Sequence, residues 1–468
     1  MFTLSESLLP MNRIMFFILG LINCISLSAF SQESKDWTAL FNGKDLKGWK
    51  TAGGAARFSV SDQTIVGTTV PNTGNTFLVT EKQYGDFLLE LEVMIEDTAG
   101  NAGVQTRSHI DPKGNKGKGK VYGRQVEVDP SSRKWSGGIY DEGRRDWLYP
   151  LELNTAAEDA FRNGEYNKMK IECIGNEMKT WINGKACAYV VDTIDRSGFI
   201  ALQVHGISNP SNAGKKVFYK NIRIKTNNLI PLPFDRNIYV ANFRPNELTS
   251  YEKKDGWRLL FDGHSGEGWV SAKDTQSFPT RGWKIANGTF SVEGSTGQES
   301  TNGGDIITKE LFSVFDLSFE FRLTPGANSG VKYFVTAQEK NEGSAIGLEY
   351  QVLDDSLHPD AKLGINGNRT LASLYDLIRA EKQKRFLRPI GAWNFGRVIV
   401  YPDNKVEHYL NGVKVLEYQR GSPEYRKLVA GSKYKIWPNF GEAPAGHVLL
   451  QDHGNQVSFR SIKIRTTL

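Results

Sequence analysis

The chain has 468 residues, of which 39% are hydrophobic and 24% are charged, and its formal net charge is +6. This composition excludes a largely disordered chain, and the length predicts two domains. The basic residues are scattered and no nucleic-acid-binding motif is present, so the sequence predicts no nucleic-acid partner. With 47 glycines and 11% aromatic residues, the composition favours many short strands joined by tight turns.

The first 31 residues have the character of an export signal. The stretch 11–31 has one basic residue, an apolar core and small residues at its end, and it is too short for a stable membrane span. We therefore expect residues 1–31 to be a cleaved signal peptide. The mature protein is expected to be periplasmic or secreted and not an integral membrane protein. A lipid-modified Cys24 is the less favoured alternative, because Asn23 fits poorly before a lipidated cysteine.

Beyond this signal the chain has two cysteines, Cys173 and Cys187. An exported compartment permits a disulfide between them. We slightly favour two small buried thiols instead. Neither cysteine has the paired Cys/His spacing of a zinc site.

One unit occurs twice in the sequence. Residues 37–49 and 257–269 share Leu-Phe-Asn/Asp-Gly and Gly-Trp at matched spacing. Near the end of each copy, an apolar run predicted to be a buried strand ends in Gln-x-His, at Gln203 and His205 and again at Gln451 and His453. Residues two apart share one face of a strand, so each Gln/His pair is predicted to close a polar network or to line a site.

Alternating polar and apolar residues predict further strands, for example at 87–93 and 317–323. Asn-Gly pairs at 183–184 and 411–412 are typical of hairpin turns. Helical patterns are rare, and residues 376–384 are among the few candidates for a short helix. The sequence thus predicts an all-β protein with one antiparallel sandwich per copy. The predicted segments are the copies at 36–226 and 254–468 and a proline-containing linker at 227–253.

Several motifs resemble those of the 3-keto-disaccharide hydrolase domain, a family formerly known as a domain of unknown function. They are Asn328-Ser-Gly330, 347–354, Ser373-Leu-Tyr-Asp376, 408–412, 449–454 and 459–462. The resemblance covers nearly all of the chain after the signal, once per copy, and is stronger in the second copy. It implies two tandem concanavalin A-like jelly rolls and cleavage of glycosides already oxidised at C3 of the sugar. A sugar 3-dehydrogenase would then act upstream.

The two copies depart from the family pattern in different ways. The first has Gln125 where Glu is usual and Val204 where Asp is usual before the histidine. The second has Phe334 where an arginine is common, whereas the first keeps Arg107. These departures put the activity of the first copy in doubt, and it is expected to be a scaffold, a binding copy or a unit with another substrate.

The implied reaction requires a base, a group that stabilises an enolate, and an acid. A C3 ketone acidifies the hydrogen on C2, so that a base removes it, the oxygen on C1 leaves by β-elimination, and water adds back. His453 and Glu349 are candidates for base or acid, and Lys332 for stabilising the enolate. A divalent ion held by Glu349 and His453 is a further alternative. The residues expected to bind substrate are Asn328, Gln351, Trp393 and Gln451, with Arg107, Glu127, Gln203 and His205 in the first copy.

Each candidate also has an ordinary structural interpretation: a strand-end histidine is often hydrogen-bonded, a lysine solvated and a tryptophan packed. The alternative function is carbohydrate binding without catalysis. A retaining glycosidase ranks last, because it needs two carboxylates about 5–5.5 Å apart and the predicted same-face neighbour of Glu349 is Gln351. Glu127 and Asp129 keep that alternative open in the first copy. The aglycone, the linkage and the activity of each copy stay undecided.

Overall fold

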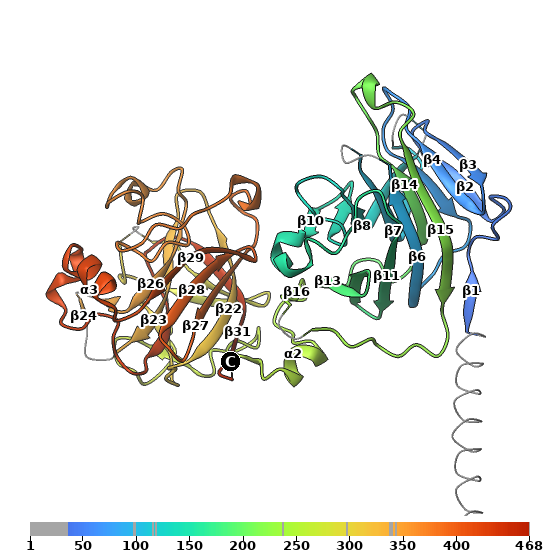
Figure 1. Cartoon of the computed structure of the whole chain (residues 1–468). Coiled ribbons are helices and arrows are strands. Elements are labelled where there is room, and N and C mark those ends of the chain that lie inside the picture. The colour runs from blue at the N-terminus through green and yellow to red at the C-terminus, as the bar shows by residue number, and fades with distance from the viewer. Residues whose placement is uncertain are drawn as a thin grey trace, which may run out of the picture. The chain divides into compact units, whose positions relative to one another are not determined.

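The computed structural model describes residues 36–467 apart from 97–99, 115–116, 118, 236–237, 296–297, 337–339 and 342–343. The predicted signal peptide and Cys24 lie outside the described residues. The chain divides into two compact units between Ala241 and Asn242 (Figure 1). None of the helices described here is long and apolar enough to cross a membrane.

The first unit contains two antiparallel sheets of nine and seven strands. They face each other across a buried core, where the Tyr219 hydroxyl donates to the Gln203 carbonyl oxygen at 2.8 Å. The nine-stranded sheet has the order β16-β13-β12-β11-β6-β15-β4-β3, with β1 paired to β15, and the seven-stranded sheet has the order β10-β9-β8-β7-β14-β5-β2. The strands are β1 Trp37–Ala39, β2 Trp49–Gly53, β3 Arg57–Ser61, β4 Thr64–Thr68, β5 Thr76–Thr80, β6 Phe87–Ile95, β7 Ala102–Asp111, β8 Lys120–Val128, β9 Ile139–Glu142, β10 Asp146–Tyr149, β11 Asn167–Ile174, β12 Glu177–Ile182, β13 Lys185–Val191, β14 Phe199–Val204, β15 Lys216–Lys225 and β16 Ala241–Asn242.

The second unit repeats this plan with an eight-stranded and a five-stranded sheet. The orders are β19-β20-β31-β22-β27-β28-β29, with β17 paired to β31, and β18-β21-β30-β23-β26. The strands are β17 Arg258–Leu259, β18 Trp269–Ser271, β19 Trp283–Ala286, β20 Thr289–Val292, β21 Ile306–Thr308, β22 Phe315–Leu323, β23 Asn328–Val335, β24 Lys340–Asn341, β25 Ser344–Ala345, β26 Leu348–Leu353, β27 Asn394–Val400, β28 Lys405–Leu410, β29 Val413–Gln419, β30 His447–Leu450 and β31 Val457–Arg465. The helices of the described chain are short: α2 Ser250–Lys254, α3 Pro423–Ala430, η2 Leu151–Ala157, η3 Pro210–Asn212, η4 Pro359–Lys362, η5 Lys384–Phe386 and η6 Lys433–Ile436.

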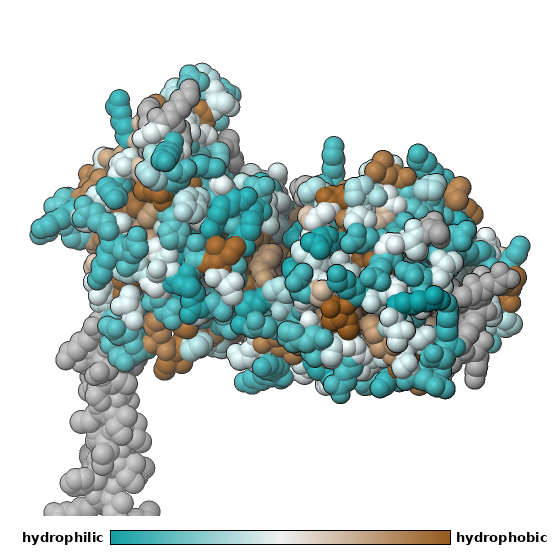
Figure 2. Space-filling model, turned by 180° about the vertical axis from the view of Figure 1, so that it is seen from behind, coloured by the Kyte–Doolittle hydropathy of each residue, from teal (hydrophilic) through white to brown (hydrophobic). Residues whose placement is uncertain are grey.

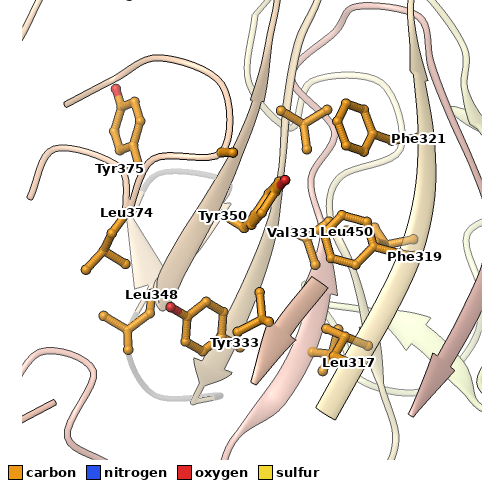
Figure 3. Packing of buried hydrophobic residues seen from close by; sticks show 14 of the residues in the cluster. Leu317, Phe319, Phe321, Val331, Tyr333, Leu348, Tyr350, Leu374, Tyr375 and Leu450 are labelled. Atoms are coloured by element: carbon orange, nitrogen blue, oxygen red, sulfur yellow. The ribbon is translucent and has the colours of Figure 1, made fainter. Parts of the chain in front are cut away.

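The core of the second unit decides which side chains are left for a site. Phe319 of β22 packs against Tyr350 of β26 with ring centroids 5.2 Å apart, and Val331 and Tyr333 of β23 join the same cluster (Figure 3). Because successive side chains point to opposite faces of a strand, residues between these core positions point away from the core. Lys332, the residue between Val331 and Tyr333, is therefore placed on the outer face of the five-stranded sheet.

The predicted all-β fold, one sandwich per copy, is confirmed. Asn411 and Gly412 have φ values of 51° and 87° between β28 and β29, as expected for a two-residue hairpin turn. The short helix predicted at 376–384 is wrong. Leu374 bridges to Ile378 there, and the carboxylate of Asp376 accepts from Arg369 Nε at 2.7 Å and from the Lys433 backbone N–H at 2.9 Å. These contacts fix a turn and override the local helix propensity.

The segment 242–255, most of which falls in the predicted linker, packs onto the second unit. Helix α2 begins with a capping box formed by Thr249 and Glu252. Glu252 pairs with Lys463, and the Asn246 side chain accepts from the Ser461 backbone N–H at 2.7 Å. Contacts with β31 therefore hold this segment in place.

Both cysteines beyond the predicted signal, Cys173 and Cys187, are buried free thiols. The favoured expectation of two small buried side chains is thus confirmed. The surface shown in Figure 2 is mainly hydrophilic, with apolar residues scattered over it.

Candidate functional site

A cavity of about 140 Å³ opens on the outer face of the five-stranded sheet. Lys332 and Glu349 stand directly opposite each other on β23 and β26 and form its floor. Its lining consists of Glu299, Asn328, Lys332, Ile346, Gly347, Glu349, Gln351, Tyr375, Lys433, Tyr434, Ile436, Trp437, Gln451 and His453. Apart from Trp393, every site residue predicted in the second copy is therefore brought together here.

Lys332 is a buried charge, not a solvated surface lysine. Its ammonium donates to the Ala345 carbonyl oxygen at 3.1 Å and lies 3.7 Å from Glu299 Oε1 and 3.8 Å from Asp305 Oδ2. Burial lowers the pKa of Lys332, but the carboxylates of Asp305, Glu349 and Glu299 outweigh it, and the net effect is a raised pKa. The cavity therefore keeps a fixed positive charge at neutral pH.

Glu349 is also buried, with 5% of its surface exposed. Burial raises the pKa of its carboxyl to about 7, although the nearby Lys332 and Lys433 ammonium groups act in the opposite direction. No residue of the described chain donates a hydrogen bond to this carboxylate. At neutral pH such a group can both take up and release a proton, as a catalytic acid or base must.

Three side chains of the cavity carry buried polar atoms without a hydrogen-bond partner among the described residues. These atoms are Asn328 Oδ1, Gln451 Oε1 and His453 Nδ1. Buried polar atoms in folded proteins are nearly always paired, and an unpaired one costs stability. All three side chains line the same small cavity, which makes it a candidate site for a polar ligand.

The prediction that Gln451 and His453 share one face of a strand needs correction, because β30 ends at Leu450. Both residues lie in the segment just after the strand, which the buried Asp452 holds in place. Its Oδ2 accepts from the backbone N–H groups of Gly303 and Gly304 at 3.0 and 2.9 Å, and its Oδ1 accepts from Gly454 at 2.9 Å. These backbone contacts end the strand and position the two neighbouring side chains.

The cavity also contains residues that were not predicted from the sequence. Lys433 Nζ lies 4.3 Å from the ring centroid of Tyr375, and loss of solvent lowers the pKa of this lysine. Tyr434 and Trp437 come from the same short segment around η6. Tyr375 lies within the family motif Ser373-Leu-Tyr-Asp376, and this motif could have indicated a place in the site. Nothing comparable in the sequence marks the segment 433–437.

Trp393 does not line the cavity, so its expected role in substrate binding is not supported. Two guanidinium groups lie over its ring, that of Arg322 at 4.9 Å and that of Arg460 at 4.0 Å from the ring centroid. It comes just before β27, in the opposite sheet. The tryptophan thus serves cation–π packing on that sheet.

A metal bound by Glu349 and His453 would have no third His, Cys, Asp or Glu ligand among the described residues. Within the described ranges, no group of three or more His, Cys, Asp and Glu side chains is arranged to hold a metal ion. A two-residue donor set does not fit the usual protein metal site.

A model of the family described as the 3-keto-alpha-glucoside-1,2-lyase-like domain matches residues 36–225 and again 256–465. The chain belongs to this family. Two lyase-like domains in tandem account for the repeated motifs, and the resemblance inferred from those motifs is confirmed.

The chain is also similar to individual proteins. A 3-keto-disaccharide hydrolase from Bacteroides thetaiotaomicron is 36% identical over 252 residues, which cover 48% of this chain and 85% of that protein. A solved structure of a proposed glycosyl hydrolase from Parabacteroides distasonis is 30% identical, covers 48% of this chain and 100% of its own, and gives a TM-score of 0.41. A second solved structure from that organism is 23% identical. The match covers 45% of this chain and 99% of that chain, and its TM-score is 0.35. The family and the Bacteroides relative together support a glycoside-cleaving hydrolase.

In the first lyase-like domain, the equivalent strand pair carries neutral side chains. Gln105 of β7 stands opposite Gln125 of β8. Gln105 Nε2 donates to Gln125 Oε1 at 2.9 Å, and Gln125 Nε2 donates to Glu127 Oε2 at 3.0 Å. Glu127 also accepts from Asn101 at 2.5 Å, and burial raises its pKa to about 7. These polar groups satisfy one another without a ligand.

Arg107 is wrong as a substrate-binding residue of the first lyase-like domain. It is fully buried, and it donates to the carbonyl oxygens of Gly85 and Gly175 at 2.7 and 2.8 Å and to Asp86 at 2.7 Å. A guanidinium engaged in this way ties strand β7 to neighbouring loops and has no donor in a cavity.

The Gln203/His205 pair of the first lyase-like domain is split. Strand β14 ends at Val204; Gln203 is fully buried with both amide atoms unpaired, whereas His205 is exposed. His205 and Asn101 line a different pocket, of about 230 Å³, which Gln203 does not line. The expected substrate-binding set of this domain therefore does not converge on one cavity.

Proposed function

We propose that the second lyase-like domain cleaves 3-keto-glycosides by proton abstraction at C2, β-elimination at C1 and hydration. The observation that carries this proposal is the pairing of Glu349 and Lys332 on one cavity floor, beside three polar atoms left without partners. The name of the Bacteroides relative points to the same class of substrate.

Glu349 is the base in this proposal. Its carboxyl has a pKa of about 7, so a substantial fraction is ionised at neutral pH and retains enough basicity to remove the C2 proton. Lys332 stays protonated, because the surrounding carboxylates raise its pKa. Loss of the C2 proton forms an enolate, in which the oxygen on C3 becomes negative. The positive charge of Lys332 stabilises this oxygen.

His453 then acts as the acid. Its side chain lines the cavity, and an imidazole can serve as the general acid that protonates the glycosidic oxygen as the C1–O bond breaks. Water adds its oxygen to C1 and a proton to C2, so that the net reaction is hydrolysis and the ketone is retained. Asn328, Gln351 and Gln451 are the side chains available to hold sugar hydroxyls.

The test is to incubate the purified protein with a 3-keto-glucoside and with its unoxidised parent in deuterated water. We expect cleavage of the keto sugar alone and one deuterium at C2 of the released 3-keto-glucose. Cleavage of neither compound by folded protein, with and without added divalent ions, would contradict the proposal. Glycan binding without turnover, unchanged in His453→Ala, would favour a carbohydrate-binding protein instead.

We further propose that the protein acts after export from the cytoplasm, on a substrate supplied by a sugar 3-dehydrogenase. The apolar stretch 11–31 motivates the first statement and the need for a C3 ketone the second. Fractionating the host cells and sequencing the N-terminus of the protein tests the export step, because a chain that keeps Met1 or Met11 and stays in the cytoplasm would contradict it.

A further inference from the structure

The size of the cavity limits how much of a glycoside it can enclose. Its volume is about 140 Å³. Pockets that enclose a drug-sized ligand measure roughly 300–1,000 Å³. The cavity therefore suits a single sugar ring, which on the proposed function is the oxidised sugar, and the leaving group must lie at the mouth.

One side of the mouth is formed by Ile436 and Trp437. Ile436 lines the cavity and yet is 69% exposed, which places it where the cavity meets solvent. The short helix η6 that carries it is anchored beneath. Tyr434 stacks on Phe440 with ring centroids 3.9 Å apart, and the Lys433 backbone N–H donates to Asp376.

The His453 end of the cavity also has an apolar residue nearby. The ring of His358 lies 5.9 Å from that of His453, and its neighbour Leu357 is 64% exposed. The carboxylate of Asp354 fixes this turn by accepting from the Ser356 backbone N–H at 2.9 Å. An apolar side chain is thus exposed to solvent near His453, as Ile436 is at the other side of the mouth.

Single exposed apolar residues are common on proteins and need no explanation by themselves. Ile436 differs because it belongs to the lining of the cavity that holds Lys332 and Glu349. A leaving group placed there covers Ile436 and part of Trp437, and apolar surface gains most from being covered by apolar surface. A second sugar has hydroxyls on most of its carbons, so it would gain less binding free energy from this contact than an apolar ring.

We propose that the leaving group preferred at this mouth is an apolar ring, aromatic or alicyclic, over a second sugar. The inference rests on the proposed function of the same cavity. It assigns Ile436 and Trp437 to recognition of the aglycone, outside the set of residues that act on the oxidised sugar.

The experiment compares phenyl and methyl 3-keto-glucosides in the wild type and in Ile436→Ser. We expect the wild type to prefer the phenyl compound after correction for the intrinsic reactivity of the two leaving groups, measured with hydroxide alone. Ile436→Ser should lower kcat/KM for the phenyl compound by roughly tenfold, as for other losses of one apolar contact, and leave the methyl compound within twofold. The matched control is Leu311→Ser, which removes a side chain that is 53% exposed and does not line the cavity.

An equal fall for both compounds, or no fall for either, would overturn the inference while leaving the proposed function intact. Cleavage of neither compound by the wild type would instead overturn the proposed function. In that case the same comparison made with dissociation constants from calorimetry still decides the inference. A 3-keto-disaccharide bound or cleaved as well as the phenyl compound, and equally sensitive to Ile436→Ser, would also contradict it.

Discussion

The two units of this chain use one strand pair in two ways. In the second unit, Lys332 and Glu349 face each other across β23 and β26. In the first, Gln105 and Gln125 occupy the equivalent places on β7 and β8. The amides hydrogen-bond each other, whereas the charged pair borders a cavity with unpaired polar atoms. The same backbone thus supports two amides that bond each other in one unit and a charged pair that borders a cavity in the other.

A raised pKa does not by itself separate the two units. Burial raises the pKa of both Glu127 and Glu349 to about 7. The difference lies in their partners, because Glu127 accepts hydrogen bonds from Asn101 and Gln125, and none of the described residues donates one to Glu349. A carboxyl that is available to a substrate therefore has to be recognised from geometry together with its pKa.

Replacing Glu349 by Gln should have the largest effect. The change gives the second unit the side chain that the first has at Gln125, and it removes the proposed base, so kcat/KM for a 3-keto-glucoside should fall about 1,000-fold. The matched control is Glu127→Gln, for which we expect a change within twofold. Steady-state kinetics measure kcat/KM for both variants. A large fall for Glu127→Gln with little change for Glu349→Gln would place the active site in the first unit.

Replacing Lys332 by Gln should lower kcat/KM about 100-fold at pH 7, because the enolate loses a nearby positive charge. The change also removes an ammonium that lowers the pKa of Glu349. The acid limb of the pH–rate profile should therefore move to higher pH. A profile that stays in place would exclude Glu349 as the group titrating in that limb, and Lys414→Gln on the surface serves as the control.

Glu349→Gln should also make the second unit more stable in alkaline solution. The folded pKa of Glu349 lies above its ordinary value, so folding is favoured at low pH and this advantage is lost as the pH rises through about 7. The variant lacks that loss and should gain about 3 kcal/mol at pH 8, and little at pH 4.5. Calorimetry at both values tests the sign, with the exposed Glu267→Gln as control.

The smallest effect is expected for Trp393→Ala. This tryptophan contacts Arg322 and Arg460 and does not line the cavity, so kcat and KM should stay within twofold of the wild type. A large rise in KM alone would restore the interpretation of Trp393 as a sugar-binding residue.

Local sequence patterns predicted the strands well because burial repeats every second residue along a half-buried strand. The same alternation correctly placed Lys332, Glu349 and Gln351 together, since all three lie inside regular strands. It failed at His205, which follows the end of β14 and is exposed, and at Arg107, whose partners are distant in sequence. The segment 433–437 could not be predicted, because only tertiary contacts bring it to the cavity.

The contacts of Asn246 set the smallest fragment of the second unit that can be expected to fold. Its side-chain amide donates to the Gly288 carbonyl oxygen at 2.8 Å and accepts from Ser461, so that it joins β31 to the turn between β19 and β20. The ring of Phe243 packs edge-on against that of Phe395, with centroids 5.9 Å apart. A fragment starting at Trp257 would lose these contacts and would leave Lys463 without Glu252. Expression of this half alone should therefore begin no later than Asn242.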